Sequence, residues 1–225
     1  MADRRLPSTT GTAAGSLPRL ESPPRGADVT RERLLQAAHE LLFERSGGNV
    51  SVSEICDRAS VNVAMVRYCF GSKNGMLDAL VERVTGSFTD ELDVLAAADL
   101  SSTVKLRRHV GAIVRNYVRF PYLNRLLSER FIADREVAER LSRVFAAPTR
   151  AWHERLLEEG LNSGEFRAID PTFFFFSVIG LCEFLFAARP WLEHGFQATL
   201  DEELLERFVE HSADLVLSGV RAVGK

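Results

Sequence analysis

Residues 46–75 read SGGNVSVSEICDRASVNVAMVRYCFGSKNG, and this stretch decides the fold. It predicts two short helices joined by a tight turn. The first helix begins after Ser51, because Ser51-Val52-Ser53-Glu54 has the form of a capping box, in which the serine and glutamate side chains satisfy backbone amides reciprocally. Asn62 is a favourable N-cap for the second helix, and Gly71 ends it. Such a helix–turn–helix places its second helix in the DNA major groove in many proteins.

The same corner also occurs in all-α cores that bind no DNA, so spacing alone leaves both interpretations open. Amphipathic helices flank it on either side. The upstream segment, which begins at Thr30, carries an apolar stripe with a period of about 3.6 residues. The downstream segment carries a longer stripe of the same kind from Met76 to Leu95. The sequence therefore predicts a three-helix domain over residues 29–75, followed by a connecting helix over residues 76–96.

This arrangement resembles the tetracycline-repressor (TetR) family of bacterial transcription regulators over residues 30–83. The family pattern has an Arg-rich helix start, an Ile-Ala-Ala-Gly-Val-type turn, an aromatic-rich recognition helix and a Phe-x-Ser-Lys exit. The residues that meet this pattern are Ile55, Ala59, Val61, Tyr68, Phe70, Ser72 and Lys73. After residue 83 the resemblance is architectural only.

The resemblance implies an all-α chain. An N-terminal helix–turn–helix domain precedes a larger helical domain, residues 76–225, for dimerisation and ligand binding. It also implies a sequence-specific DNA-binding transcriptional regulator, a repressor that a small-molecule effector releases from DNA. We expect the recognition helix to face the duplex, with phosphate contacts at both ends of the corner. The expected DNA-binding residues are Arg31, Ser51, Ser53, Asn62, Val63, Ala64, Arg67, Tyr68, Ser72 and Lys73.

The chain departs from the family at several of these positions. Ser60 stands where the family has glycine, and a left-handed backbone at a serine would cost about 1 kcal/mol. The family's phosphate-binding Thr, Tyr and His-or-Tyr fall on Met65, Arg67 and Cys69. Arg67 can bind a phosphate or a guanine edge, whereas Met65 and Cys69 cannot replace what they displace. We therefore expect an atypical set of operator contacts.

Composition limits the other classes of function. The net charge is −3, and residues 25–75 carry seven Lys or Arg against six Asp or Glu, a balance of +1. DNA affinity must then come from well-placed contacts and from pairing two domains in a dimer. Three isolated cysteines without a CxxC spacing suggest neither a disulfide framework nor a metal site. We expect no cofactor and a cytoplasmic location, and residues 1–28, rich in proline and without apolar periodicity, predict a disordered leader.

Every segment after residue 101 reads as helix. Residues 173–186 are apolar nearly all round, but the run is too short for a membrane span and contains Glu183. A helix of this kind must be covered on every side, which predicts a second subunit packed against it and against the last helix, about residues 201–220. The expected interface residues are Val178, Leu181, Leu185, Phe208, Ser212 and Leu215. A symmetric homodimer would present two recognition helices to a palindromic operator.

The C-terminal domain also contains large apolar residues with a few polar ones among them, a composition that suits a small apolar effector. The expected ligand-binding residues are Asn116, Phe120, Leu127, Arg130, Phe131, Trp152, His153, Leu156, Phe174, Glu183 and Phe186. An aromatic-rich core would have the same composition, and the family resemblance is what favours a ligand site.

Two other functions remain open from the sequence. The first is a DNA-binding adaptor whose C-terminal domain binds a protein partner. The second is an all-α enzyme, which is disfavoured because the chain shows no phosphate-binding glycine-rich loop, no metal-spaced cluster and no nucleophile motif.

Overall fold

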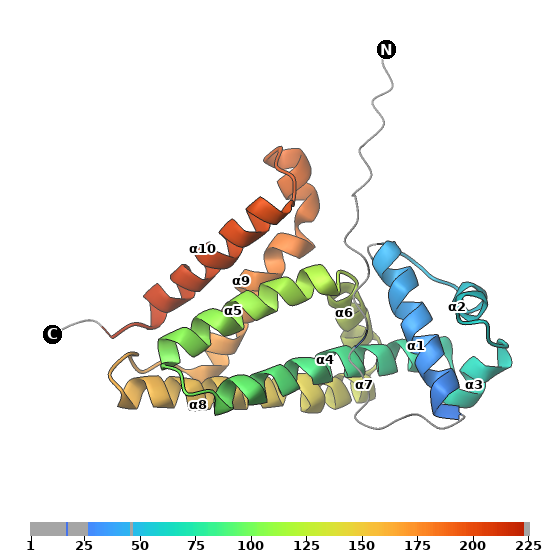
Figure 1. The fold of residues 1–225 in the computed structure, drawn as a ribbon, viewed down its shortest axis with the longest axis horizontal. Helices are drawn as coiled ribbons and strands as arrows, with labels where there is room; N and C mark the ends of the chain where they lie inside the picture. The colour runs from blue at the N-terminus through green and yellow to red at the C-terminus, as the bar shows by residue number, and fades with distance from the viewer. Residues whose placement is uncertain (1–16, 18–26, 46, 223–225) are drawn as a thin grey trace, which may run out of the picture.

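The structure, a computed structural model, describes residues 17, 27–45 and 47–222. Over these residues the chain is helical without named strands, which confirms the all-α prediction (Figure 1). The N-terminal helices are α1 (Ala27–Glu44), α2 (Val52–Ala59) and α3 (Ala64–Phe70). They gather at one end of the long helix α4 (Lys73–Ala97), which corresponds to the predicted connecting helix.

The remaining helices are α5 (Ser102–Arg119), α6 (Leu123–Ala133), α7 (Arg135–Leu141), α8 (Ala147–Asn162), α9 (Pro171–Ala187) and α10 (Glu202–Val220). Of these, α6 and α7 lie toward the end of α4 that carries α1–α3, and the others extend toward its far end (Figure 1). Two π-helical turns interrupt this series, η1 (Ser142–Ala146) before α8 and η2 (Trp191–Gly195) after α9. Pro148 lies in the first turn of α8, where a missing amide donor is tolerated.

The corner is built by the local contacts that the sequence predicted. The Ser51 hydroxyl accepts from the Glu54 amide, and the Glu54 carboxylate accepts from the Ser51 amide at 2.8 Å, so the capping box is confirmed. The Asn62 Oδ1 accepts from the Ala64 amide at 2.8 Å, at the start of α3. The Ser72 hydroxyl caps α4 by accepting from the Gly75 amide at 3.0 Å.

Ser60 ends α2 with a left-handed backbone, at φ 54° and ψ 50°. The turn has therefore not adjusted to avoid the conformation that glycine adopts at this place in the family. Because Cβ crowds the backbone in this region, the serine carries a conformational cost of about 1 kcal/mol. Its amide donates to the carbonyls of Cys56 and Asp57, which closes the end of α2 in spite of that cost.

The apolar interior consists of two clusters. We call the first the N-terminal core; it joins α1–α3, the first half of α4, and helices α6 and α7. The second, the C-terminal core, joins the second half of α4 with α5, α8, α9 and α10. The predicted boundary between residues 75 and 76 falls inside the N-terminal core. Helices α6 and α7 therefore pack with the DNA-binding end of the molecule.

Two further observations concern the sequence predictions. Of the predicted leader, Leu17 is buried in the N-terminal core and its amide donates to Gln36 Oε1 at 3.3 Å, and α1 already begins at Ala27. Residues 1–16 and 18–26 lie outside the described part of the chain. No helix among the described residues is long and apolar enough to cross a membrane.

Candidate DNA-binding surface and ligand cavity

The outer face of α3 is free of protein contacts over most of its length. Arg67 and Tyr68 are exposed, Tyr68 to 74%. On the opposite side Val66 is buried in the N-terminal core and Phe70 packs against it. Asn62, Val63 and Ala64, at the start of α3, are exposed as well. The structure therefore presents the predicted recognition residues together on one surface.

The other predicted DNA contacts lie around this surface. The Arg31 guanidinium stacks over the Phe70 ring at 4.7 Å from its centroid, which ties α1 to the end of α3. Ser53 is exposed. The hydroxyls of Ser51 and Ser72 serve as helix caps, so only their remaining hydrogen-bonding capacity is open to a phosphate. Lys73 is half-buried at the start of α4.

Acidic neighbours neutralise two of the nearby arginines. Arg45 pairs with Glu54 at 2.6 Å and lowers the pKa of that carboxyl to about 2. Arg58 pairs with Glu44 at 2.9 Å and also contacts Glu40. By contrast, neither Arg67 nor Lys73 has an acidic partner within ion-pair distance in the described part of the chain. These two cations are therefore available to DNA.

A cavity of about 560 Å³ lies between α4, α5, α6, η1, α8 and α9. Its wall combines residues of the N-terminal core, such as Leu123 and Leu127, with residues of the C-terminal core, such as Leu92. The cavity therefore lies at the junction between the two cores. Its volume is typical of sites for small organic ligands, which are mostly apolar with a few polar groups.

Three of the predicted ligand-binding residues line this cavity: Asn116, Leu127 and Glu183. Seven others do not. Phe120 is buried in the N-terminal core, and Arg130 is ion-paired to Asp78. Trp152, His153, Leu156, Phe174 and Phe186 pack within or against the C-terminal core behind the wall. The side chain of Phe131 lies outside the described part of the structure.

The sequence analysis missed most of the wall. Phe88, Glu91 and Leu92 enter it from α4, Tyr117 from α5, and Phe175 and Phe176 from α9. Phe88 and Leu92 share a stripe with Leu95 on the connecting helix, and this stripe is longer than the three-helix domain needs. The extension of this apolar stripe beyond the three-helix domain was the signal in the sequence that α4 also lines the ligand cavity.

A pair of histidines closes one part of the wall. His109 lines the cavity, and its Nε2 lies 2.8 Å from Nε2 of the buried His153. One ring must donate and the other accept, so the two side chains take different tautomers when both are neutral. Burial lowers the pKa of His153 to about 4 and lowers that of His109 well below its usual value. Both rings are therefore uncharged at neutral pH.

Helices α9 and α10 leave an apolar surface uncovered. Phe173, Phe176, Phe184 and Leu215 are more than half exposed. Of the predicted interface residues, Leu215 lies on this surface, and Leu181, Leu185 and Phe208 are partly exposed. Val178 and Ser212 are fully buried within the subunit, because α9 and α10 turn these positions toward the C-terminal core. Their predicted place at the dimer interface is therefore corrected.

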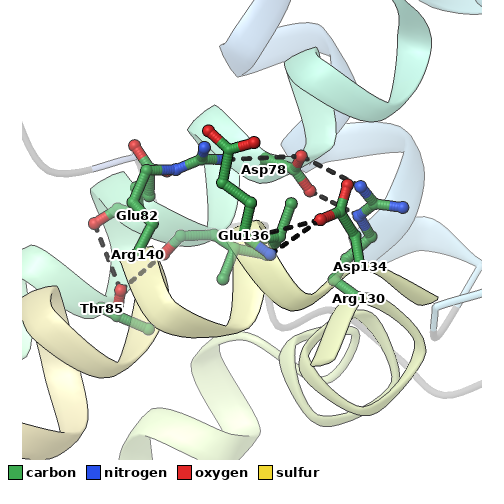
Figure 2. A network of polar contacts seen from close by, with 9 residues as sticks. Asp78, Glu82, Thr85, Arg130, Asp134, Glu136 and Arg140 are labelled. Carbon is green, nitrogen blue, oxygen red and sulfur yellow. Dashed lines mark hydrogen bonds and ion pairs between the residues drawn. The ribbon is translucent and has the colours of Figure 1, made fainter. Parts of the chain in front are cut away.

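A polar network joins α4 to α6 and α7, as Figure 2 shows. The Asp78 carboxylate is nearly buried and accepts from Arg130 Nε at 2.5 Å and from Arg130 Nη2 at 3.1 Å. Arg140 lies 3.6 Å from the same carboxylate and also pairs with Glu82. Asp134 caps α7 by accepting from the Glu136 amide at 2.9 Å. Helices α6 and α7 are thus fixed to the half of α4 that carries the helix–turn–helix.

Comparison with known families agrees with this architecture. Residues 99–225 match the family described as "Tetracyclin repressor-like, C-terminal domain", and residues 34–80 match "Bacterial regulatory proteins, tetR family". The chain belongs to the TetR family. The resemblance stated from the sequence is therefore confirmed, and the fold and family are those of transcriptional regulators.

Individual TetR-family relatives are distant. The chain is 27% identical over 177 residues to the nucleoid occlusion factor SlmA of Escherichia coli (O1:K1 / APEC), which covers 76% of this chain and 88% of SlmA. A TetR/AcrR regulator from Thermobifida fusca YX-ER1 superposes with a TM-score of 0.67 at 21% identity, covering 85% of this chain and 98% of that one. FadR from Bacillus subtilis in complex with stearoyl-CoA superposes at 0.66 with 17% identity, covering 84% and 98%. At these identities the two structures show a shared fold.

Proposed function

We propose that this TetR-family protein is a homodimeric repressor that leaves its palindromic operator when a small, largely apolar molecule binds the cavity. The observation that carries the proposal is the position of the cavity at the junction of the two cores. A ligand there contacts both the helices that hold the DNA-binding end and the helices that carry the exposed apolar face. We infer a regulator that binds DNA and a ligand, with no catalytic role.

Dimerisation is supported by the exposed aromatic side chains of α9 and by Leu215 of α10. Several large apolar side chains exposed on two neighbouring helices are typical of a subunit interface. A symmetric dimer would place two α3 helices on the same face of DNA when they lie about 34–36 Å apart, one helical turn. The weak net charge of the DNA-binding domain is then offset by doubling the number of specific contacts.

The ion-pair network supplies a connection between the cavity and DNA. Helix α6 contributes Leu123, Asn124, Leu127 and Ser128 to the cavity wall. The same helix is ion-paired to α4 through Arg130 and Asp78, and the N-terminal end of α4 directly follows α3 in the chain. A ligand that moves α6 relative to the C-terminal core therefore also moves the recognition helix. It can shift the dimer to a wider spacing only if it binds that state more tightly.

Selection of genomic fragments by the purified protein, followed by fluorescence anisotropy on the selected duplex, tests this proposal. We expect the dimer to bind the duplex saturably. Compounds that raise the melting temperature of the protein should also release it from the duplex, since both the higher melting temperature and the release require a compound that binds the folded protein. A protein that binds no duplex selectively would contradict the proposal.

A second candidate is a DNA-binding adaptor, for which the relative named nucleoid occlusion factor SlmA gives only weak support. The cavity argues against it, because an adaptor needs no apolar cavity of about 560 Å³. If compounds bind the cavity without any change in DNA affinity, the adaptor becomes the better account.

A further inference from the structure

The charge of the cavity wall narrows the class of effector. Of the residues that form the wall, none is lysine or arginine, and its one histidine, His109, is neutral. The acidic side chains of the wall are the carboxyls of Glu91 on α4 and Glu183 on α9, while the Tyr117 phenol stays neutral because burial raises its pKa. The cavity therefore offers negative charge and no compensating cation. An anionic head group would meet repulsion here.

Glu183 is placed unusually for a carboxylate. It is half-buried on α9, a helix that is otherwise almost entirely apolar, and it has no ion-pair partner among the described residues. Burial raises its pKa, although the nearby Asn124 amide favours the ionised form. A carboxylate withdrawn from water without a cation destabilises the fold, so such groups are normally paired.

Two other carboxylates among the described residues are compensated: the half-buried Glu165 accepts from the backbone amides of Ser102 and Thr103, and Asp78 is ion-paired. Asp78 is buried at the junction of α4 and α6, and both Arg130 and Arg140 surround it. The two acids that serve the chain's own structure are thus compensated, Asp78 by cations and Glu165 by backbone amides. Glu183, which faces the cavity, is left without a cation. The missing partner is expected to come from the bound molecule.

Two further features of the wall suit a cation with an apolar body. The wall contains five aromatic rings, from Phe88, Tyr117, Phe145, Phe175 and Phe176. The faces of such rings attract positive charge, and the rings also pack against the apolar groups of a ligand. In addition, the Thr149 hydroxyl lines the cavity, is 1% exposed and has no hydrogen-bond partner, so it can accept from or donate to a ligand.

We propose that the effector is an apolar molecule that carries a positively charged nitrogen, which pairs with the Glu183 carboxylate. This inference rests on the proposed ligand-responsive function and names the chemical class of its ligand. It separates this chain from a regulator of fatty acids or their coenzyme A esters, although the FadR complex shares the fold. Apolar contacts hold the body of the molecule, and the ion pair selects the charge.

Calorimetric titration with three probes of equal chain length tests the proposal: decyltrimethylammonium, n-decanol and decanoate, each below its micellar concentration. The wild-type dimer should bind the cation about tenfold or more tightly than the alcohol, and decanoate most weakly. In Glu183→Gln the preference for the cation over the alcohol should disappear, while affinity for n-decanol stays the same and shows that the cavity is intact. Glu154→Gln, on the surface of α8 outside the cavity, should behave as wild type.

Equal or tighter binding of decanol or decanoate by the wild-type dimer would overturn the proposed class, whether or not the Glu183 variant folds. So would a failure of all three probes to bind. Operator binding measured with the same probes separates this outcome from the wider proposal. Release of DNA by decanoate would refute the cationic effector and leave the ligand-responsive repressor standing. If the cation binds in a Glu183-dependent way but does not release DNA, the cationic ligand stands and the ligand-responsive repressor is refuted.

Discussion

Arg130 of α6 holds Asp78 of α4 through two parallel contacts, from Nε to Oδ1 at 2.5 Å and from Nη2 to Oδ2 at 3.1 Å. Both side chains are largely shielded from water, at 12% and 7% exposure. Arg130 was expected to bind ligand and instead fixes the helix that lines the ligand cavity to the helix that carries the DNA-binding domain. The pair thus joins a helix of the cavity wall to the half of α4 that follows the DNA-binding domain.

Arg130→Met should lower the free energy of unfolding by about 3 kcal/mol, because it leaves a buried carboxylate with only the more distant Arg140. Urea unfolding measures this loss. Arg135→Met is the matched control: Arg135 forms an exposed ion pair with Glu139, and its loss should change stability by less than about 1 kcal/mol. Equal effects of the two substitutions would show that the Asp78 pair is not structural.

Arg67→Ala should weaken binding to the selected operator by about 1–3 kcal/mol per half-site, since Arg67 is exposed on α3 without an acidic partner. Its melting temperature should stay within experimental error of the wild type. Arg150→Ala removes the same charge from α8, far from the corner, and should leave operator affinity unaltered. A drop in melting temperature with unchanged affinity would place Arg67 in a structural role.

Ser60→Gly should stabilise the protein by about 1 kcal/mol, because glycine adopts the left-handed backbone without the clash of Cβ. The same substitution at Ser53, an exposed position inside α2, should destabilise by about 0.5 kcal/mol through loss of helix propensity. Chemical unfolding of both variants decides the question. A destabilised Ser60 variant would mean that the turn is not strained.

His153 should make stability fall under acid conditions. Its pKa is near 4 in the folded protein and near its ordinary value of 6.5 when unfolded. Between these values the unfolded chain binds the extra proton, so the free energy of unfolding decreases as pH falls, by up to about 1.4 kcal/mol per pH unit. The stability is fully present above the unfolded pKa.

The groups that face His153 are the neutral His109 and the rings of Trp152, Phe174 and Phe175. None of these supplies a negative charge to hold an imidazolium. His153→Gln should therefore reduce the acid slope in denaturation curves recorded on both sides of the unfolded pKa, leaving the share that comes from the buried His109. His194→Gln, at an exposed site, should retain the wild-type slope; loss of the slope in both variants would refute the assignment to the buried pair.

Phe184→Glu should separate the dimer into folded monomers, because Phe184 is 58% exposed within the subunit but would meet the partner's apolar surface. Light scattering gives the mass, and circular dichroism shows whether the fold survives. Val94→Glu changes an apolar residue of α4 that is 75% exposed and lies outside the α9–α10 surface, and it should leave the dimer intact. A stable dimer for Phe184→Glu would remove the assigned interface.

The sequence predicted the corner in detail because its determinants are local. The caps at Ser51 and Ser72 depend on neighbours within three residues and are present. At the start of α3 the N-cap position is Val63, and Asn62, one residue earlier, accepts from the Ala64 amide. The ligand cavity could not be predicted at the same level. Which residues face the cavity depends on how each helix is rotated about its axis relative to its neighbours. On α9, a rotation by one residue position decides whether Phe174 or Phe175 lines the cavity.

The π-helical turn η1 adds a second difficulty. It was not visible in the pattern, and it shifts the register between α7 and α8 relative to a regular helix. Phe145, inside this turn, faces the cavity, whereas Trp152 and Leu156 further along α8 pack in the C-terminal core. The exposed face of α9 was predictable from composition. The orientation of α9 was not predictable, which is why Val178 and Ser212 were assigned to the dimer interface instead of the C-terminal core.

In the proposed mechanism the cavity and the DNA-binding surface are coupled, and coupling is reciprocal. The direct measurement is the affinity of the dimer for its selected operator with and without a saturating concentration of whichever of the three decyl probes binds most tightly. The account predicts that the probe weakens operator binding by about tenfold or more, and that operator DNA weakens probe binding by the same factor. An operator affinity that the bound probe leaves unchanged would contradict it.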